Sequence, residues 1–219
     1  MSRRPLLPYS DQARRWPVAG RQVLAAYDQD TVTVYQAYRP AIADFALEHQ
    51  RFGGEFSYSR MSWIKPGFLW MMYRAGWATK EGQERVLAVH LERAGFDRIL
   101  AEAVESSFRP GSHASREDWQ HELSRGEVRL QWDPDHDPYA KPLERRAVQL
   151  GLRGSVLALY GREWIRGIED LTPFVREQHA RVRAHDLDGL LVPEERVYPI
   201  ADPGVARRLG VDAAGSGGC

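Results

Sequence analysis

Residues 60–77, RMSWIKPGFLWMMYRAGW, combine cations, aromatic rings and a hydroxyl group in a pattern that could bind a nucleotide. Pro66 suits the first turn of a helix, so Ser62, Trp63 and Lys65 directly precede the positively polarised end of that helix. Such a helix end attracts phosphate, and the flat ring of Trp63 could stack on a base. We therefore interpret the start of this helix as a candidate nucleotide pocket.

The body of the same helix gives a different signal. Positions 68–73 are apolar on every face, which is typical of a buried core helix, and this alternative stays open for the apolar residues. Arg74 follows Trp70 by four residues and Trp77 follows it by seven, so the three share one face. A buried Arg74 would need an acidic partner or an anionic ligand, because an unpaired buried charge is costly.

The acidic segment DPDHDP at 133–138 has half of a calcium-loop pattern, with aspartates at loop positions 1, 3 and 5 and Glu144 at position 12. Pro138 stands at position 6, where the sharp turn requires glycine. We therefore expect a solvated turn whose aspartates bond their own backbone, and no bound metal. Asp133 or His136 could still line a site from this loop.

The elements that must position these residues mix strands and helices without a regular βαβ period, which favours an α+β fold. Residues 1–20 are expected to form an extended N-terminal arm, 21–186 a single α+β domain, and 187–219 a C-terminal extension with a flexible tail. The patterns predict strands over 31–38, 85–91, 127–132 and 145–152, a strand over 163–171 that turns into a helix, and helices after Pro40 and over 66–76, 95–108 and 115–123.

Composition narrows the function classes. The 30 basic and 30 acidic residues cancel, so a nucleic acid would have to bind a local patch of cations. The one cysteine is Cys219, which fits a reducing compartment. The longest apolar run is too short to span a bilayer, and the first residues lack the pattern of a signal peptide. We expect a cytoplasmic protein with no membrane partner. The candidate nucleic-acid contacts are Arg60, Arg145, Arg146 and Arg153, although surface arginines are usually only solvated.

Several strings, among them VYQAYRPAIADFA, RMSWIKPGFLWMMYRAGWATKEGQERVLAVHL, VRLQWDPDHDP and IEDLTPFVREQ, resemble domain-of-unknown-function family 4291. The resemblance runs from about Trp16 to Gln178, and the long string that contains RMSWIKP is highly specific. This family brings almost no functional information with it.

A second resemblance does imply a function. VYQAYRPAIADFALEHQRF is similar to the first strand and following helix of ADP-ribosyltransferases. It implies a split, mixed or antiparallel sheet with flanking helices, and NAD as the substrate. Gln36 takes the place of the first-strand histidine or arginine, and Tyr38 the place of the threonine that follows. The Glu-x-Glu or Gln-x-Glu pattern of the last catalytic strand is missing, and Gln149 and Glu169 are the stand-ins.

This resemblance implies NAD-dependent ADP-ribosyl transfer, with DNA or RNA as the leading acceptor. The nicotinamide would lie on an aromatic face, and a cation would hold the diphosphate. The expected cofactor contacts are Arg21, Tyr35, Ser62, Trp63, Lys65 and Arg74. Two alternatives stay open: a non-catalytic module that binds a nucleotide or single-stranded nucleic acid, and a hydrolase of nucleotides or ADP-ribose conjugates that uses Asp133, Asp135 or Glu169.

Overall fold

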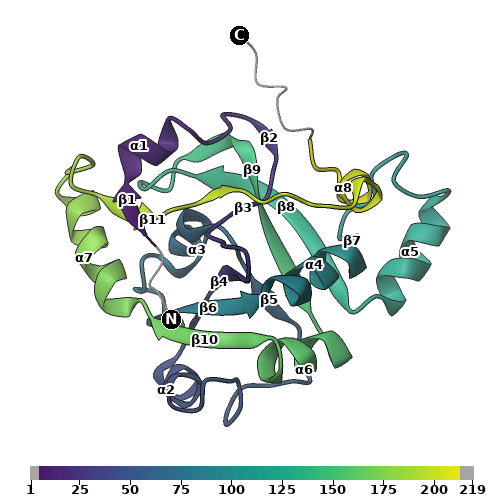
Figure 1. Ribbon diagram of the computed structural model, residues 1–219, viewed down its shortest axis with the longest axis horizontal. Coiled ribbons are helices and arrows are strands. Elements are labelled where there is room, and N and C mark those ends of the chain that lie inside the picture. The colour runs from purple at the N-terminus through teal and green to yellow at the C-terminus, as the bar shows by residue number, and fades with distance from the viewer. Residues whose placement is uncertain (1–4, 213–219) are drawn as a thin grey trace.

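The computed structural model describes residues 5–212, which form a mixed α+β fold around a sheet in two halves (Figure 1). The first half is antiparallel and has β6 in its middle. The second half is mixed, because β7 and β2 run parallel to their neighbours while β8, β9 and β5 pair antiparallel. The first half contains β4 (Thr31–Tyr38), β6 (Arg85–Glu92) and β10 (Ile165–Asp170). The second contains β2 (Gly20–Arg21), β5 (Ser62–Ile64), β7 (Ala103–Glu105), β8 (Val128–His136) and β9 (Pro142–Leu152).

The two halves meet at one residue pair. The Tyr35 amide donates to the Lys65 carbonyl at 2.7 Å, and the Lys65 amide donates to the Tyr35 carbonyl at 3.3 Å. Within residues 5–212, no other backbone hydrogen bond joins β4 to β5. Beyond this pair the two strands separate, and the backbone edge of β5 needs other partners.

Hydrophobic residues cover both faces of the divided sheet, because alternate residues of β4 point to opposite faces. Val32 and Val34 belong to the larger core, which is closed by α2, α4 and α6. Tyr35 belongs to the smaller core, which is closed by α3 and α7. These helices are α2 (Pro40–His49), α3 (Phe68–Ala75), α4 (Arg93–Glu102), α6 (Gly154–Arg162) and α7 (Thr172–Arg183).

Segments from the two ends of the described chain pair with each other. β1 (Leu6–Pro8) is antiparallel to β11 (Leu191–Pro193), and β3 (Leu24–Ala25) is antiparallel to β12 (Arg196–Val197). The expected extended arm is wrong over α1 (Tyr9–Ala13), and Trp16 is buried. The periphery is completed by α5 (Arg116–Arg125) and α8 (Pro203–Leu209). The flexible tail predicted after 212 and the first four residues of the arm lie outside the described residues.

Most of the predicted elements are confirmed, and two are corrected. The helix expected over 95–108 ends at Glu102, because residues 103–105 are buried and pair in parallel with β8. The loop expected at 133–138 is strand as far as His136, because β9 pairs with this segment. Cross-strand pairing outweighs the local turn preference there. Asp137 does bond its own turn, where its carboxylate accepts from the amides of residues 139 and 141.

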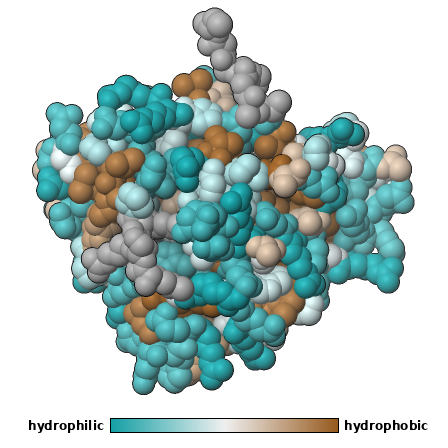
Figure 2. Space-filling view, viewed as in Figure 1, coloured by the Kyte–Doolittle hydropathy of each residue, from teal (hydrophilic) through white to brown (hydrophobic). Residues whose placement is uncertain are grey.

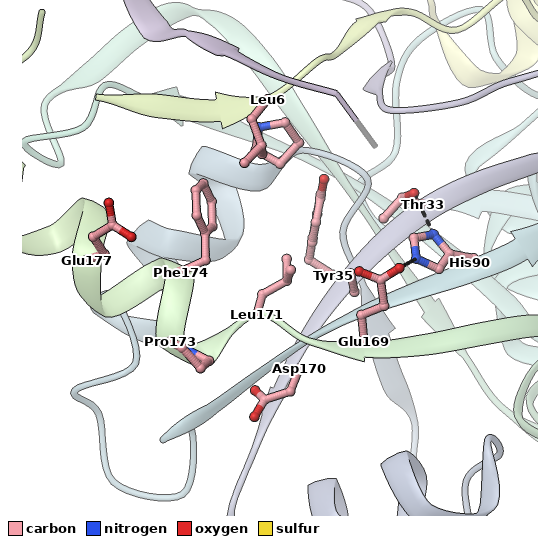
Figure 3. Close-up of a pocket in the computed structure, with 12 residues that line it drawn as sticks. Leu6, Thr33, Tyr35, His90, Glu169, Asp170, Leu171, Pro173, Phe174 and Glu177 are labelled. Atoms are coloured by element: carbon pink, nitrogen blue, oxygen red, sulfur yellow. Dashed lines mark hydrogen bonds and ion pairs between the residues drawn. The ribbon is translucent and has the colours of Figure 1, made fainter. Parts of the chain in front are cut away.

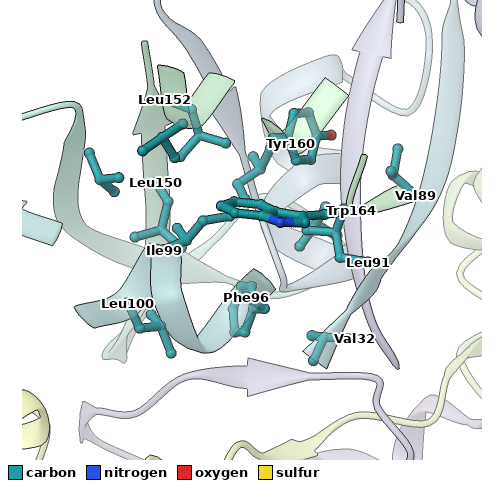
Figure 4. Packing of buried hydrophobic residues seen from close by; sticks show 14 of the residues in the cluster. Val32, Val89, Leu91, Phe96, Ile99, Leu100, Leu150, Leu152, Tyr160 and Trp164 are labelled. Atoms are coloured by element: carbon teal, nitrogen blue, oxygen red, sulfur yellow. The ribbon is translucent and has the colours of Figure 1, made fainter. Parts of the chain in front are cut away.

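The larger core depends on a close approach between α4 and the ring of Trp164 (Figure 4). A Cβ atom on Gly95 would lie 2.7 Å from Cγ of this ring. Helix propensity alone would favour alanine at Gly95 by about 1 kcal/mol. We nevertheless expect Gly95→Ala to lower the free energy of unfolding by about 1–3 kcal/mol, measured by urea denaturation, because the buried ring must move.

Gly67→Ala is the matched control for this substitution, because a Cβ there would meet only the Cβ of Trp70, at 3.7 Å. If Gly95→Ala were as stable as the wild type, the packing of Trp164 would not constrain this position.

The face of the molecule in Figure 2 is largely hydrophilic, with smaller hydrophobic areas between the polar ones. In the described part of the chain, every helix is too short or too polar to cross a lipid bilayer.

Candidate functional site

Side chains fill the opening between β4 and β5. Gln36 is almost fully buried, and its amide nitrogen lies 3.2 Å from the carbonyl of Trp63, on the unpaired edge of β5. The same nitrogen lies 2.7 Å from the Tyr38 hydroxyl and 2.9 Å from Oγ of Ser62, while Oε1 accepts from the Tyr160 hydroxyl. The structure therefore brings Gln36, Tyr38 and Ser62 together, and it adds Tyr160, which the sequence analysis missed.

Two buried phenols keep this network polar but uncharged. Burial is the largest cause of the raised pKa values of Tyr38 and Tyr160. Both hydroxyl groups therefore stay protonated at neutral pH and remain available as hydrogen-bond donors. The network lies on the face of the larger core and links β4 to β5 and α6.

Lys65 reaches the same opening from the other face. Its ammonium group lies 3.4 Å from the Trp63 carbonyl, and the residue is only 6% exposed. Among residues 5–212, no carboxylate lies within ion-pair distance of it. Burial, together with a smaller effect of Arg74, lowers the pKa of Lys65 to about 8, and only Asp133 opposes the change. A buried cation without a paired anion is costly, and it indicates an anionic ligand.

A carboxylate clamped by two amides lies within electrostatic range of Lys65. Gln131 and Gln149 are directly opposite each other on β8 and β9. Gln131 donates to one oxygen of Asp133 at 2.8 Å, and Gln149 donates to the other at 2.7 Å. Asp133 is half-buried, and each of its oxygens retains a further lone pair that could accept a ligand hydroxyl.

The ring of Trp63 packs closely against β9 at Gly151, its partner residue. A Cβ atom at Gly151 would be 3.0 Å from Cε2 and Cζ2 of this ring, so only glycine allows the close approach. Residues two apart in a strand share a face, which places Trp63 with Lys65 and Gly151 with Gln149. We call the set Trp63, Lys65, Gln131, Asp133 and Gln149 the junction surface.

The other expected cofactor contacts are spread more widely. Arg74 is exposed on α3, where its guanidinium lies 5.9 Å from the ring centre of Trp70, so it has no need of a buried partner. Arg21 pairs with Glu105 at 3.2 Å, away from the opening. Ser62 points to the face opposite Trp63, towards Tyr38. Tyr35 and Glu169 line a separate pocket on the first half of the sheet.

The four arginines proposed for nucleic acid do not form one surface. Arg60 and Arg146 are exposed. Arg145 is instead buried, pairs with Asp135 at 2.6 Å and lies over the ring of Trp16. Arg153 donates to the carbonyl of Gly126 at the end of α5. Asp135 is therefore held in an internal ion pair.

The pocket that contains Tyr35 and Glu169 has a volume of about 680 Å³ (Figure 3). Within it, Oγ1 of Thr33 lies 3.0 Å from Nδ1 of His90, and Nε2 of His90 lies 3.1 Å from Oε1 of Glu169. The sequence analysis missed Thr33 and His90. The clearest available signal was His90, the one polar residue inside the apolar run of RVLAVHL, whereas Thr33 is one of several polar residues in TVTVYQAY.

Comparison with known proteins adds a family but no activity. No curated protein matches the sequence. A family model described as a domain of unknown function, DUF4291, matches residues 22–198. This match includes the whole junction surface and both strands that form the opening. Because it spans most of the 219 residues, the chain belongs to domain-of-unknown-function family 4291.

Proposed function

We propose that this protein binds NAD at the junction surface and transfers its ADP-ribose group to a nucleic acid. The observation that carries the proposal is the buried ammonium of Lys65, which lies at the opening of the sheet and has no carboxylate in contact among the described residues. The diphosphate of NAD is a fitting partner, because charge-assisted hydrogen bonds to phosphate would offset the burial of the cation.

The neighbouring groups suit the remaining parts of NAD. The ring of Trp63, partly exposed over Gly151, offers a flat face for the nicotinamide. Asp133 offers carboxylate oxygens to the ribose hydroxyls, and Gln149 fixes one of them. Arg74, exposed near Lys65, can approach the outer phosphate.

The proposed reaction depends on stabilising the positive charge that develops on the ribose when nicotinamide leaves. The bond between C1′ of the ribose and the nicotinamide nitrogen breaks, and its electron pair leaves with neutral nicotinamide. The ribose gains oxocarbenium character, which the Asp133 carboxylate stabilises. A nucleophilic oxygen or nitrogen of the acceptor then bonds to C1′ and releases its proton to solvent. Exposed Arg60, just before β5, is positioned to contact the acceptor backbone.

The division of the sheet supports this proposal, because the resemblance to ADP-ribosyltransferases implies a split sheet. Gln149 lies on β9 next to the opening, where the resemblance implies a glutamate. An amide at that position favours the second candidate function, a module that binds nucleotides without turnover. In the catalytic alternative, Asp133 supplies the negative charge that Gln149 lacks.

Asp133→Asn separates catalysis from binding. We expect it to slow nicotinamide release from NAD, in the presence of a single-stranded oligonucleotide, by about 100-fold or more, because a charge that stabilises the transition state is removed. ADP-ribose binding, measured by calorimetry, should change by less than about threefold, since Lys65 is retained. Asp188→Asn, at an exposed position distant in sequence, is the matched control.

Binding of NAD without nicotinamide release by the wild type would establish the non-catalytic module. If neither NAD nor ADP-ribose binds at millimolar concentration, the junction surface is not a nucleotide site and both candidate functions are excluded.

A further inference from the structure

We propose that the pocket on the first half of the sheet is a second ligand site, which takes a monocation with an apolar body, such as an arylalkylamine or an alkylguanidine. The pocket lies between the strands β4, β6 and β10 and the start of α7 (Figure 3). Its volume of about 680 Å³ suits a small organic ligand. It is lined by Leu6, Thr33, Tyr35, Ala88, His90, Glu169, Asp170, Leu171, Pro173, Phe174, Glu177 and Pro193.

The charge of the lining selects for a cation. Three of the described lining residues are carboxylates, and none is a lysine or arginine. Asp170 is neutralised by Arg85 at 2.8 Å, and Glu177 lies 3.9 Å from Arg181, which leaves Glu169 as the acidic group without an arginine or lysine partner among the described residues. An ammonium or guanidinium group is therefore attracted, whereas an anion is repelled.

The Glu169 carboxylate is held in place for such a contact. One of its oxygens accepts from Nε2 of His90 at 3.1 Å, and the other nitrogen of the same ring contacts Thr33. The second oxygen of Glu169 has no hydrogen-bond partner in the described part of the chain. A carboxylate fixed by one oxygen and open at the other is prepared for a charged donor.

The walls of the pocket favour an apolar body next to the charge. Tyr35 packs edge-on against Phe68, with 5.5 Å between ring centres, and Phe68 lies 6.0 Å from Phe174. This aromatic row fixes the two rings that face the pocket, Tyr35 and Phe174 (Figure 3). Both can hold an aryl or alkyl group, and both can attract a cation through their faces.

This site is distinct from the proposed NAD site, although the two are neighbours through the Tyr35–Lys65 pair. The junction surface presents an unpaired cation and suits phosphate, whereas the pocket presents carboxylates and suits the opposite charge. The two proposals therefore succeed or fail separately.

The experiment is calorimetric titration of the full chain with three probes of similar shape: phenethylamine, 2-phenylethanol and phenylacetate. We expect phenethylamine to bind at least about tenfold more tightly than the neutral alcohol, and phenylacetate to bind most weakly. Saturating ADP-ribose should leave the affinity for phenethylamine unchanged within about twofold.

Glu169→Gln keeps a partner for His90 but removes the charge, so it should weaken phenethylamine binding by about tenfold or more. Glu163→Gln, at an exposed position at the end of α6 and outside the pocket lining, is the matched control. Phe174→Ala tests the apolar wall independently and should weaken phenethylamine and 2-phenylethanol alike. Equal binding of the amine and the alcohol, an unaffected Glu169→Gln variant, or no binding at millimolar concentration would each overturn the proposal.

Discussion

Replacing Lys65 with methionine is expected to make the protein more stable at pH 7 while lowering its affinity for ADP-ribose by at least about tenfold. Methionine keeps an unbranched apolar chain of similar length, and it removes an ammonium that is 6% exposed and has no carboxylate in contact among residues 5–212. Its burial lowers the pKa of Lys65 from 10.5 to about 8, which corresponds to a cost on the order of 3 kcal/mol for the charged form. The free energy of unfolding of Lys65→Met should rise by about 1–3 kcal/mol.

The stability that Lys65→Met gains over the wild type should decrease as the pH rises. The folded protein releases the Lys65 proton near pH 8, whereas the unfolded chain keeps it up to about 10.5. Between these values the unfolded state binds more protons, so the stability of the wild type rises with pH, and Lys65→Met lacks this rise. The advantage of the variant should therefore be largest below pH 8 and shrink above it.

The affinity for ADP-ribose should fall in Lys65→Met, whereas the free energy of unfolding rises. A charged hydrogen bond to phosphate is worth about 1.5–3 kcal/mol, so Lys65→Met should lose at least about tenfold in affinity for ADP-ribose. In the wild type this affinity should fall above about pH 8, where Lys65 loses its charge. Urea denaturation and calorimetry at pH 7 and pH 9 measure both effects.

Lys141→Met, at an exposed lysine, is the matched control and should change neither property. A destabilised Lys65→Met variant with full ADP-ribose affinity would show that Lys65 serves the fold and not a ligand.

The parts of the site that could be predicted from the sequence are those that a single local segment encodes. In the predicted strand over 31–38, the period of two puts Gln36 and Tyr38 on one face, and the hydrogen bonds of both residues to Ser62 agree with this. Pro66 correctly indicated a helix that starts just after Lys65, although its first helical residue is Phe68. These inferences needed only two local rules: side chains alternate between the faces of a strand, and proline is common in the first turn of a helix.

The other site residues come together only because certain strands become neighbours, and a local sequence pattern does not predict which strands pair. Asp133 appeared to belong to a loop, because its own segment, DPDHDP, is rich in turn residues. Pairing with β9 instead extends the strand and sets Asp133 beside Gln149, sixteen residues later. Thr33 and His90 meet for the same reason, across the pair β4–β6. Arg145 was expected at the surface, but the ion pair with Asp135 turns it inward.

Glu195→Gln should produce the second large effect, a gain in stability that appears only as the pH rises. Glu195 joins three distant segments. Its carboxylate accepts from the Phe68 amide at the start of α3 at 2.7 Å, its amide donates to Gln12, and its carbonyl accepts from the Trp16 ring. Burial, with a contribution from Asp135, raises the pKa of Glu195 from 4.5 to about 8, although the Phe68 amide and Arg145 oppose the change.

The sign of the effect follows from proton binding. Between pH 4.5 and about 8, the folded state holds a proton that the unfolded state has released, so stability from this group is complete below pH 4.5 and is lost as the pH rises through 8. A glutamine side chain keeps the oxygen that accepts from Phe68 and cannot ionise. Glu195→Gln should therefore match the wild type near pH 5 and exceed it by about 3–5 kcal/mol at pH 9.

Denaturation curves at a series of pH values measure this difference directly, and Glu194→Gln is the neighbouring control. Wild-type and Glu195→Gln curves that stay parallel from pH 5 to pH 9 would contradict the burial of an ionisable proton at this position. Divergence between pH 5 and pH 8 has a further consequence, because Glu195 anchors the first residue of α3. The Phe68 amide favours the ionised carboxylate, whereas burial opposes it, so ionisation near pH 8 would place a buried charge at the start of the helix that carries Arg74, in the same pH range in which Lys65 loses its charge.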